Sequence, residues 1–453
     1  MQACLKCKVA PCFGTLQGLG SGARPVPPDG SPLARSAALA GCLRATAKQI
    51  PMKIDSGHTA LAVRLKGHRI GVLNRFGGDH HRFSFEQDYV DDPNRPTLSL
   101  SFKGRSGGLV SSVRPISCRL PPFFSNLLPE GHLRTYLAEQ AGVKTTQEFL
   151  LLAALGADLP GAVTVTPFAT DQPVPGALRF SLAGVQLKFS AVMEASGGLT
   201  IPAHGIGGFW IVKLPSMQFP AVAENEYVML ELARAVGIAV PQTRLVPVSA
   251  VHGLPAEAAR LPGQALAVRR FDRTPDGERI HMEDFAQVFG LFPEDKYGRR
   301  SYANIAAVLR AETSDEGAQE FVRRLAFSVA IGNGDMHLKN WSLLYPDGRA
   351  PVLSPAYDFV ATLPYIAGDR LALTFGGSRS LGGITTDQVR RFAGKASLPA
   401  SAVWQTVCET TERTAAAWVH LPQKELLPPE MRKAIDMQIQ NVAASTSGGR
   451  GKT

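Results

Sequence analysis

Nine residues, GNGDMHLKN at positions 332–340, combine side chains and a spacing that suit phosphoryl transfer. Asp335 precedes Asn340 by five positions, and Asp358 follows in the run AYDFV. Kinase sites have a base and two metal ligands in this order: one side chain takes the proton of the attacking hydroxyl, and two hold Mg²⁺ against the phosphates. Carboxylate and amide oxygens suit this hard cation. We predict Asp335 as the catalytic base and Asn340 and Asp358 as magnesium ligands.

The same residue types also cluster in ordinary surface loops, so the flanking segments have to distinguish the two interpretations. Residues 321–331 have the apolar spacing of a buried helix that stops at Gly332. WSLLYPDG predicts a strand and a turn, and PVLSPAYDFV predicts a second short strand. This order of elements would bring the three predicted residues around one cleft.

A phosphate contact is expected upstream of this loop. Lys213 ends GGFWIVKLP, a run typical of a central strand, where a lysine either reaches solvent or points into a site. The helical pattern ENEYVMLELARAVG follows and ends at Gly237. Glu224 and Glu226 lie about 200° apart around such a helix, so only one can face Lys213. We predict Glu226.

The segment RFSLAGVQLKFSAV alternates apolar and polar residues, as a β-hairpin does. Its predicted turn, residues 182–186, could cover the ATP phosphates with backbone N–H groups, and we place Gly184 and Gln186 there. The turn contains one glycine rather than a glycine-rich phosphate motif. By itself this segment is therefore a weak signal.

Seven blocks in register resemble the HipA family of serine/threonine kinases, the toxin halves of bacterial toxin–antitoxin modules. The blocks are FSLAGVQLKFS, IVKLP, ENEY, LAVRRFDR, MEDFAQVFG, KY and GNGDMHLKN. Upstream, SLSFKGRSGG, PPFFSNLLPEGHLRTYLAEQAGV and FLLLAALGADLPGAVTV resemble the N-terminal subdomain of that family. The resemblance covers roughly residues 55–440.

The resemblance implies a role for each matching position. Asp335 would be the base, Asn340 and Asp358 would bind Mg²⁺, and Lys213 would contact the phosphates of ATP. The hinge beside adenine would be formed through the backbone of the run RRFDR, which contains Arg270, Phe271 and Asp272. Arg269 departs from the family, which commonly has glutamate there, and this puts any carboxylate contact to adenine or ribose in doubt.

Two further residues of the loop are candidates for the ATP site. Lys339 could neutralise the transferring phosphoryl group, so we include it among the catalytic residues. His337 would border the nucleotide, although its imidazole is expected mainly to hydrogen-bond backbone within the loop.

Ser181 occupies the position at which the resemblance implies an inhibitory autophosphorylation. A phosphoserine adds about −1.5 to −2 charges at neutral pH, close to a pocket for the phosphates of ATP. Repulsion would expel either the loop or the nucleotide. The residues alone favour an outward-facing strand residue at Ser181, and only the resemblance favours the autophosphorylation site.

The basic composition does not predict nucleic-acid binding. Half of the net charge of +10 lies in residues 1–51, a Gly-, Pro-, Ser- and Ala-rich leader with six basic residues and one acidic residue. The leader could be a transit or export segment, a zinc site, or sequence upstream of a true start at Met52, which we favour. The cysteines concerned are Cys4, Cys7, Cys12 and Cys42.

We therefore predict an α+β, two-lobed, protein-kinase-like fold with a small β-rich N-terminal subdomain packed on its N-lobe and a helical C-terminal lobe. The expected ranges are a leader over 1–51, the N-terminal subdomain over 52–168, the kinase domain over 177–442 with its N-lobe to about 270, and a disordered tail over 443–453. The sequence contains no run of 18 apolar residues, so it predicts no membrane-spanning helix.

The expected function is an ATP- and Mg²⁺-dependent protein kinase in the cytoplasm, with an aminoacyl-tRNA synthetase as the substrate that the resemblance suggests. The resemblance also implies a small DNA-binding antitoxin as partner, which would account for DNA association without a DNA-reading motif in this chain. Two alternatives stay open: a small-molecule phosphotransferase of the aminoglycoside-kinase type, whose loop G-D-x-H-x-x-N also matches, and an inactive partner-binding module.

Overall fold

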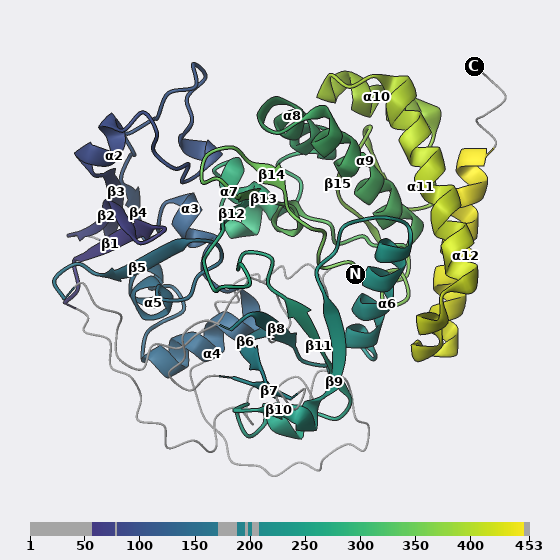
Figure 1. Cartoon of the computed structure of the whole chain (residues 1–453), viewed down its shortest axis with the longest axis horizontal. Coiled ribbons are helices and arrows are strands. Elements are labelled where there is room, and N and C mark those ends of the chain that lie inside the picture. The colour runs from purple at the N-terminus through teal and green to yellow at the C-terminus, as the bar shows by residue number, and fades with distance from the viewer. Residues whose placement is uncertain (1–56, 78, 171–187, 195–197, 202–207, 448–453) are drawn as a thin grey trace, which may run out of the picture.

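The computed structural model describes residues 57–77, 79–170, 188–194, 198–201 and 208–447. Three parts lie side by side: an N-terminal subdomain, an N-lobe built on a sheet, and a helical C-lobe that ends in the long helices α11 and α12 (Figure 1). The predicted residues Ser181, Gly184 and Gln186, and the leader over 1–51, lie outside the described residues.

The N-terminal subdomain is an antiparallel five-stranded sheet in the order β4-β3-β2-β1-β5, packed against short helices. Leu61, Val63 and Leu65 alternate toward its core, as the pattern predicts. The alternating pattern of FSFEQDYV, residues 83–90, predicts a strand throughout, but its second half forms α2. The elements are β1 (Ala60–Leu65), β2 (His68–Phe76), β3 (His80–Phe85), α2 (Gln87–Asp91), β4 (Ile116–Ser117), α3 (Pro122–Ser125), α4 (Gly131–Ala141), α5 (Glu148–Leu155) and β5 (Val163–Pro167).

The N-lobe is a six-stranded sheet in the order β10-β7-β6-β8-β11-β9, with α6 packed against β9 and β11. The helix predicted before Gly237 is confirmed, since α6 ends at Ala235 and Gly237 adopts a φ of +87°. The elements are β6 (Lys188–Met193), β7 (Leu199–Thr200), β8 (Trp210–Lys213), α6 (Val222–Ala235), β9 (Thr243–Pro247), β10 (Val251–His252) and β11 (Gln264–Arg269).

The C-lobe begins with a short sheet, β12-β13-β14, that holds the predicted catalytic segment against helices. Helix α9 lies at its centre, in contact with α8, α11 and α12. The elements are β12 (His281–Asp284), α7 (Phe285–Val288), η4 (Pro293–Lys296), α8 (Tyr302–Glu312), α9 (Asp315–Ala330), η5 (Leu338–Asn340), β13 (Ser342–Tyr345), β14 (Val352–Leu353), β15 (Arg370–Phe375), β16 (Ser378–Ser380), α10 (Thr386–Ala396), α11 (Ala400–His420) and α12 (Pro429–Ser447).

Two expectations about the ends of these parts are corrected. The disordered tail predicted from residue 443 is wrong for residues 443–447, because α12 continues to Ser447 and buries Thr446. The N-terminal subdomain contacts the C-lobe as well as the hinge that follows β11: α3 packs on α7, and Asn126 donates to the carbonyl oxygen of Leu291. In the described part of the chain, no helix combines the length and apolar character that crossing a bilayer requires.

Candidate active site

The predicted catalytic loop begins where α9 ends. Gly332 adopts a φ of +70°, a left-handed conformation that favours glycine. A Cβ added there would also lie 3.0 Å from the Cβ of Leu363. This turn redirects the chain out of the helix and carries Asp335 to the surface of the lobe.

Hydrogen bonds fix Asp335 and Asn340 relative to each other. The side-chain amide of Asn340 donates to the Asp335 carbonyl oxygen (2.9 Å), and the Asp335 N–H donates to Asn333 Oδ1 (3.0 Å). The hydroxyl of Tyr297 donates to Asp335 Oδ1 at 2.9 Å. Both predicted residues are partly exposed. A ligand can therefore approach them.

A second network of hydrogen bonds holds the loop at Gly334. The N–H of Gly334 donates to Thr362 Oγ1 (2.7 Å), and the Thr362 hydroxyl donates to Asp369 Oδ2 (2.6 Å). A Cβ on Gly334 would lie 2.1 Å from that same carboxylate oxygen. Position 334 therefore requires glycine.

The predicted pair of Lys213 with Glu226 is present in the structure, and Lys213 also pairs with Asp358. The ammonium lies between the two carboxylates and is 4% exposed as a residue. Burial alone would lower the pKa of Lys213, but the two carboxylates raise it above its ordinary value. Lys213 is consequently charged at neutral pH and directed at the same cleft as Asp358.

Asp358 sits at a turn with a φ of +55°, uncommon for a residue other than glycine. The next residue, Phe359, is buried against Phe327 and anchors this turn. Lys188 of β6 approaches the second carboxylate oxygen at 3.5 Å. Burial would raise the pKa of Asp358, but Lys188 and Lys213 lower it far below its ordinary value. Asp358 is thus an ionised carboxylate at the floor of the cleft.

A cleft of about 820 Å³, counted with the part open to solvent, runs between the lobes and reaches the N-terminal subdomain. Among the predicted residues, Lys213, Arg270, Phe271, Asp272, Lys339 and Asp358 line it. Its apolar part suits a purine ring and is formed by Ile211, Val268, Phe271, Met282 and Tyr357.

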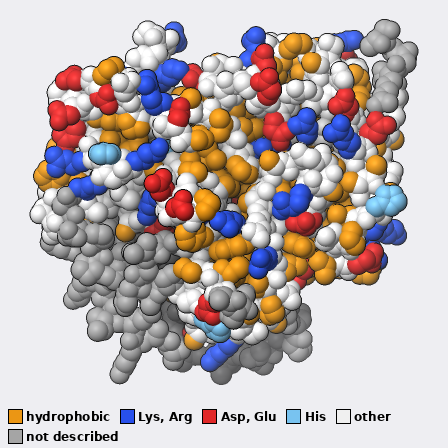
Figure 2. All heavy atoms as spheres, in the orientation of Figure 1, with side chains coloured by type: hydrophobic (Ala, Val, Ile, Leu, Met, Phe, Trp, Pro, Cys, Tyr) orange, Lys and Arg blue, Asp and Glu red, His pale blue; other side chains and the backbone are white. Residues whose placement is uncertain are grey.

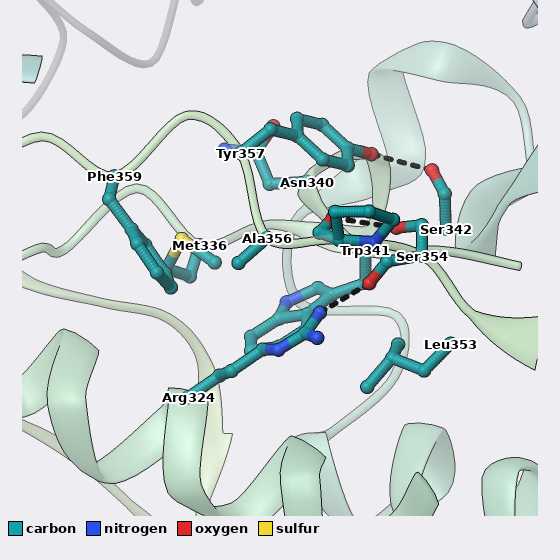
Figure 3. A pocket seen from close by; sticks show the side chains of 11 residues that line it. Arg324, Met336, Asn340, Trp341, Ser342, Leu353, Ser354, Ala356, Tyr357 and Phe359 are labelled. Atoms are coloured by element: carbon teal, nitrogen blue, oxygen red, sulfur yellow. Dashed lines mark hydrogen bonds between the residues drawn. The ribbon is translucent and has the colours of Figure 1, made fainter. Parts of the chain in front are cut away.

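Behind the loop, the chain is packed rather than open (Figure 3). Arg324 rises from α9 and donates to the Ser354 carbonyl oxygen at 2.6 Å, and the hydroxyls of Ser342 and Tyr357 hydrogen-bond each other. Asn340 lies beside Tyr357 in this layer. These contacts hold β13, β14 and the loop as one unit, so the positions of Asn340 and Asp358 are fixed by the fold.

The predicted hinge differs from expectation in what its side chains do. Arg270 and Arg273 pair with Asp272 and with Asp158 of the N-terminal subdomain, and Asp272 also accepts the N–H of Gly161. The amides of Arg269 and Arg270 already donate to the carbonyl oxygens of Gln242 and Phe209. The run RRFDR therefore joins two parts of the chain, in addition to bordering the cleft.

Lys339 has partners that the sequence did not indicate. Its ammonium donates to Asn126 Oδ1 (2.9 Å) and to the Asn126 carbonyl oxygen (3.0 Å), and it pairs with Asp284 at 3.0 Å. These contacts direct the charge toward the N-terminal subdomain. They favour a positioning role over the predicted contact with the transferring phosphoryl group.

His337 is buried, and its Nδ1 has no hydrogen-bond partner among the described residues. Burial lowers the pKa of His337 well below its ordinary value, so the imidazole is neutral at pH 7. Its ring packs edge-on against Tyr297, with centroids 5.1 Å apart. The assignment of His337 to the ATP site stays a prediction.

The donor set fits a magnesium ion of the kind that shares ligands with phosphate. Asn340 uses its amide nitrogen on the Asp335 carbonyl oxygen, which leaves the amide oxygen available, and Asp358 supplies one carboxylate. The described residues contain no cluster of three His, Cys, Asp or Glu ligands.

Three residues near the site were missed at the sequence level. Lys188 is a lysine inside an apolar strand, so the rule that selected Lys213 could have found it. Tyr297 and Asp284 lie in the blocks KY and MEDFAQVFG of the family resemblance, but their contacts could not be predicted, because the partner of each is distant in the sequence.

Comparison with known families agrees with the geometry. Residues 61–166 match the family described as "HipA N-terminal domain", and residues 180–418 match "HipA-like C-terminal domain". A Sinorhizobium fredii protein named "Putative kinase Y4dM" is 53% identical over 374 residues, which are 80% of this chain and 91% of that protein. The chain belongs to the HipA family and has its kinase-like α+β fold.

More distant relatives carry fuller names. The "Serine/threonine-protein kinase toxin HipA" of Shewanella oneidensis is 26% identical over 60% of this chain and 67% of its own. A solved complex of Shewanella oneidensis HipA with HipB and operator DNA contains a chain that aligns with a TM-score of 0.67 and 21% identity, over 87% of this chain and all of that one. This likeness confirms the predicted fold.

Charged side chains are mixed on the surface. Figure 2 shows Lys and Arg interspersed with Asp and Glu on the face that it draws. A nucleic-acid footprint would gather positive charge on one face. The described residues on this face do not form one.

Proposed function

We propose that this protein is an ATP- and Mg²⁺-dependent serine/threonine protein kinase. The observation that carries the proposal is the bridge of Lys213 between Glu226 and Asp358, beside a loop that holds Asp335 and Asn340. Protein kinases use this set of groups to hold the phosphates and the metal and to receive the nucleophile.

Each residue has a defined task in the transfer. Lys213 and Lys188 would hold phosphate oxygens, and Asn340 and Asp358 would hold Mg²⁺, which would supply positive charge to neutralise the phosphates when bound. The substrate hydroxyl oxygen forms a bond to the γ-phosphorus while the bond to the β–γ bridging oxygen breaks. Asp335 accepts the hydroxyl proton. Arg270, Phe271 and Asp272 would border the nucleotide base. The roles of Gly184 and Gln186 over the phosphates stay predictions, since both lie outside the described residues.

The biological role that we propose follows the family. The protein would act in the cytoplasm as a growth-inhibiting toxin that phosphorylates an aminoacyl-tRNA synthetase or another translation component, and phosphorylation of Ser181 would switch it off. A small DNA-binding antitoxin of the HipB type would be its partner. Support comes from the Shewanella oneidensis relative that is named a kinase toxin and from the solved complex of HipA with HipB and operator DNA.

Incubation with γ-labelled ATP and Mg²⁺ tests the proposal. Label should appear on the chain itself in the wild type and be lost in Asp335→Asn and in Ser181→Ala. Label found only on an added small-molecule acceptor would contradict a protein kinase, and absence of any transfer would favour an inactive binding module.

A further inference from the structure

The carboxylate of Asp335 is oriented by a residue outside its own loop. The backbone bonds to Asn333 and Asn340 fix where the residue stands, but they do not fix the rotation of its side chain. The Tyr297 hydroxyl does so by donating to Oδ1 at 2.9 Å.

Tyr297 is itself held from two sides. Its ring meets the buried ring of His337 edge-on, with an interplanar angle of 76°. The preceding residue, Lys296, donates to Glu130 Oε2 at 2.7 Å, and the Lys296 ammonium lies 5.5 Å from the centre of the Tyr297 ring. Glu130 is the residue immediately before α4 in the N-terminal subdomain. A path of contacts thus runs from that subdomain to the predicted base.

The charge on this path is well defined. Burial would raise the pKa of Glu130, but Lys296 and Lys339 lower it below its ordinary value. Glu130 is therefore ionised at neutral pH and keeps Lys296 in place. The side chains of Lys296 and Glu130 are only 11% and 17% exposed, so solvent screens this pair less than a surface pair.

We propose that Tyr297 is a positioning residue of the phosphoryl-transfer site, set in place by the pair of Lys296 with Glu130 from the N-terminal subdomain. This inference rests on the proposed role of Asp335 as the base. Tyr297 keeps its proton throughout: it donates a hydrogen bond to the carboxylate while the substrate hydroxyl loses its proton to the same carboxylate. The N-terminal subdomain then contributes to turnover as well as to the wall of the cleft.

The hydrogen bond from Tyr297 has a measurable consequence. It orients the base, which affects the turnover number more than nucleotide affinity. Removing the hydroxyl should therefore lower kcat and leave the affinity for Mg²⁺-ADP close to that of the wild type. A residue that only supports the fold would not give this split between turnover and affinity.

The test uses the full chain with γ-labelled ATP, Mg²⁺ and casein as the added acceptor, and it compares the wild type with Tyr297→Phe and Lys296→Met. Tyr89→Phe is the matched control, because it also removes a hydroxyl that donates to a protein oxygen, here the carbonyl of Pro96 far from the cleft. We expect Tyr297→Phe to lower kcat about tenfold, a typical effect for a hydrogen bond to a charged group. Titration with Mg²⁺-ADP should give a Kd within about twofold of the wild type.

Lys296→Met should show a smaller loss of kcat with the same unchanged nucleotide affinity, and Tyr89→Phe should match the wild type. The inference is overturned if Tyr297→Phe keeps the wild-type kcat, or if its loss is entirely in nucleotide affinity. Activity of the wild type that disappears in Asp335→Asn but persists unchanged in Tyr297→Phe would reject the role of Tyr297 alone. A wild type without transfer would reject the proposed function and this inference together.

Discussion

Two groups of buried charges use the same residue types differently. One lines the cleft, and the other lies where the N-terminal subdomain contacts the hinge and the C-lobe, a contact that we call the seam. In the cleft, Lys188 and Lys213 meet Glu226 and Asp358, and the Asp358 side chain is 22% exposed. In the seam, the side chains of Arg270 and Asp158 are closed off from solvent, with exposures of 1% and 0%.

The difference in solvent exposure indicates that the charges of the cleft serve ligand binding and that those of the seam hold the parts of the chain together. Charges in the cleft pair with one another but remain open to a ligand that carries its own phosphates and metal. Charges in the seam have hydrogen-bond partners within the chain. The carboxylate of Asp272, for example, accepts hydrogen bonds from the side chains of Arg270 and Arg273 and from the N–H of Gly161. Substitutions in the cleft should therefore reduce catalysis, and substitutions in the seam should reduce stability.

Asp358→Asn should give the largest effect and defines the cleft side of the comparison. The loss of the metal-binding carboxylate should reduce phosphoryl transfer by roughly 10⁴-fold, within the range for groups that stabilise charge in this reaction. Rates of label transfer from ATP measure it. Retention of the thermal midpoint within a few degrees would show that the fold is intact, whereas activity within tenfold of the wild type would contradict the assigned role.

Asp272→Asn tests the seam side. Removing one charge from a buried ion cluster leaves Arg270 and Arg273 without their main counter-ion, and we expect a loss of about 3 to 5 kcal/mol in the free energy of unfolding. Urea denaturation followed by circular dichroism measures it. The control is Asp387→Asn, whose pair with Arg390 is exposed and should change stability by less than about 0.5 kcal/mol. Equal effects in both variants would remove the distinction between seam and surface.

Glu283 lies in the seam and should make the free energy of unfolding depend on pH. It is fully buried and accepts from the hydroxyls of Ser99 and Tyr345 and from the N–H of Leu100, and burial raises its pKa to about 7. A carboxyl whose pKa is raised on folding stabilises the folded state below its unfolded pKa, and this contribution is lost as the pH rises through 7.

The free energy of unfolding of the wild type should therefore fall by about 3 kcal/mol more between pH 5 and pH 8 than that of Glu283→Gln. Urea denaturation at the two pH values measures the difference. Parallel pH dependences of the two proteins would show that Glu283 does not titrate in this range.

The sequence was sufficient to predict those residues of the cleft whose positions depend on local helix or strand geometry. Glu226 could be chosen over Glu224 because helix periodicity sends the two in different directions, and Lys213 was visible as a charge in an apolar strand. The strand after the catalytic loop and the end of the helix before Gly237 followed from local patterns in the same way.

The seam could not be predicted, because its partners are far apart in the sequence. Asp158 and Arg270 are separated by 112 positions, and Asn126 and Lys339 by 213. No periodicity links such pairs. For this reason Lys339 was assigned to the phosphoryl group and RRFDR to adenine alone, although both also bind the N-terminal subdomain.

The most direct test of the central claim is transfer of the γ-phosphoryl group from labelled ATP by the full chain in the presence of Mg²⁺, with Asp335→Asn as the paired variant. The account predicts label on a serine or threonine in the wild type and none in Asp335→Asn, with Mg²⁺-ADP bound equally by both. Equal labelling of the two proteins, or no labelling of the wild type although it binds the nucleotide, would contradict it.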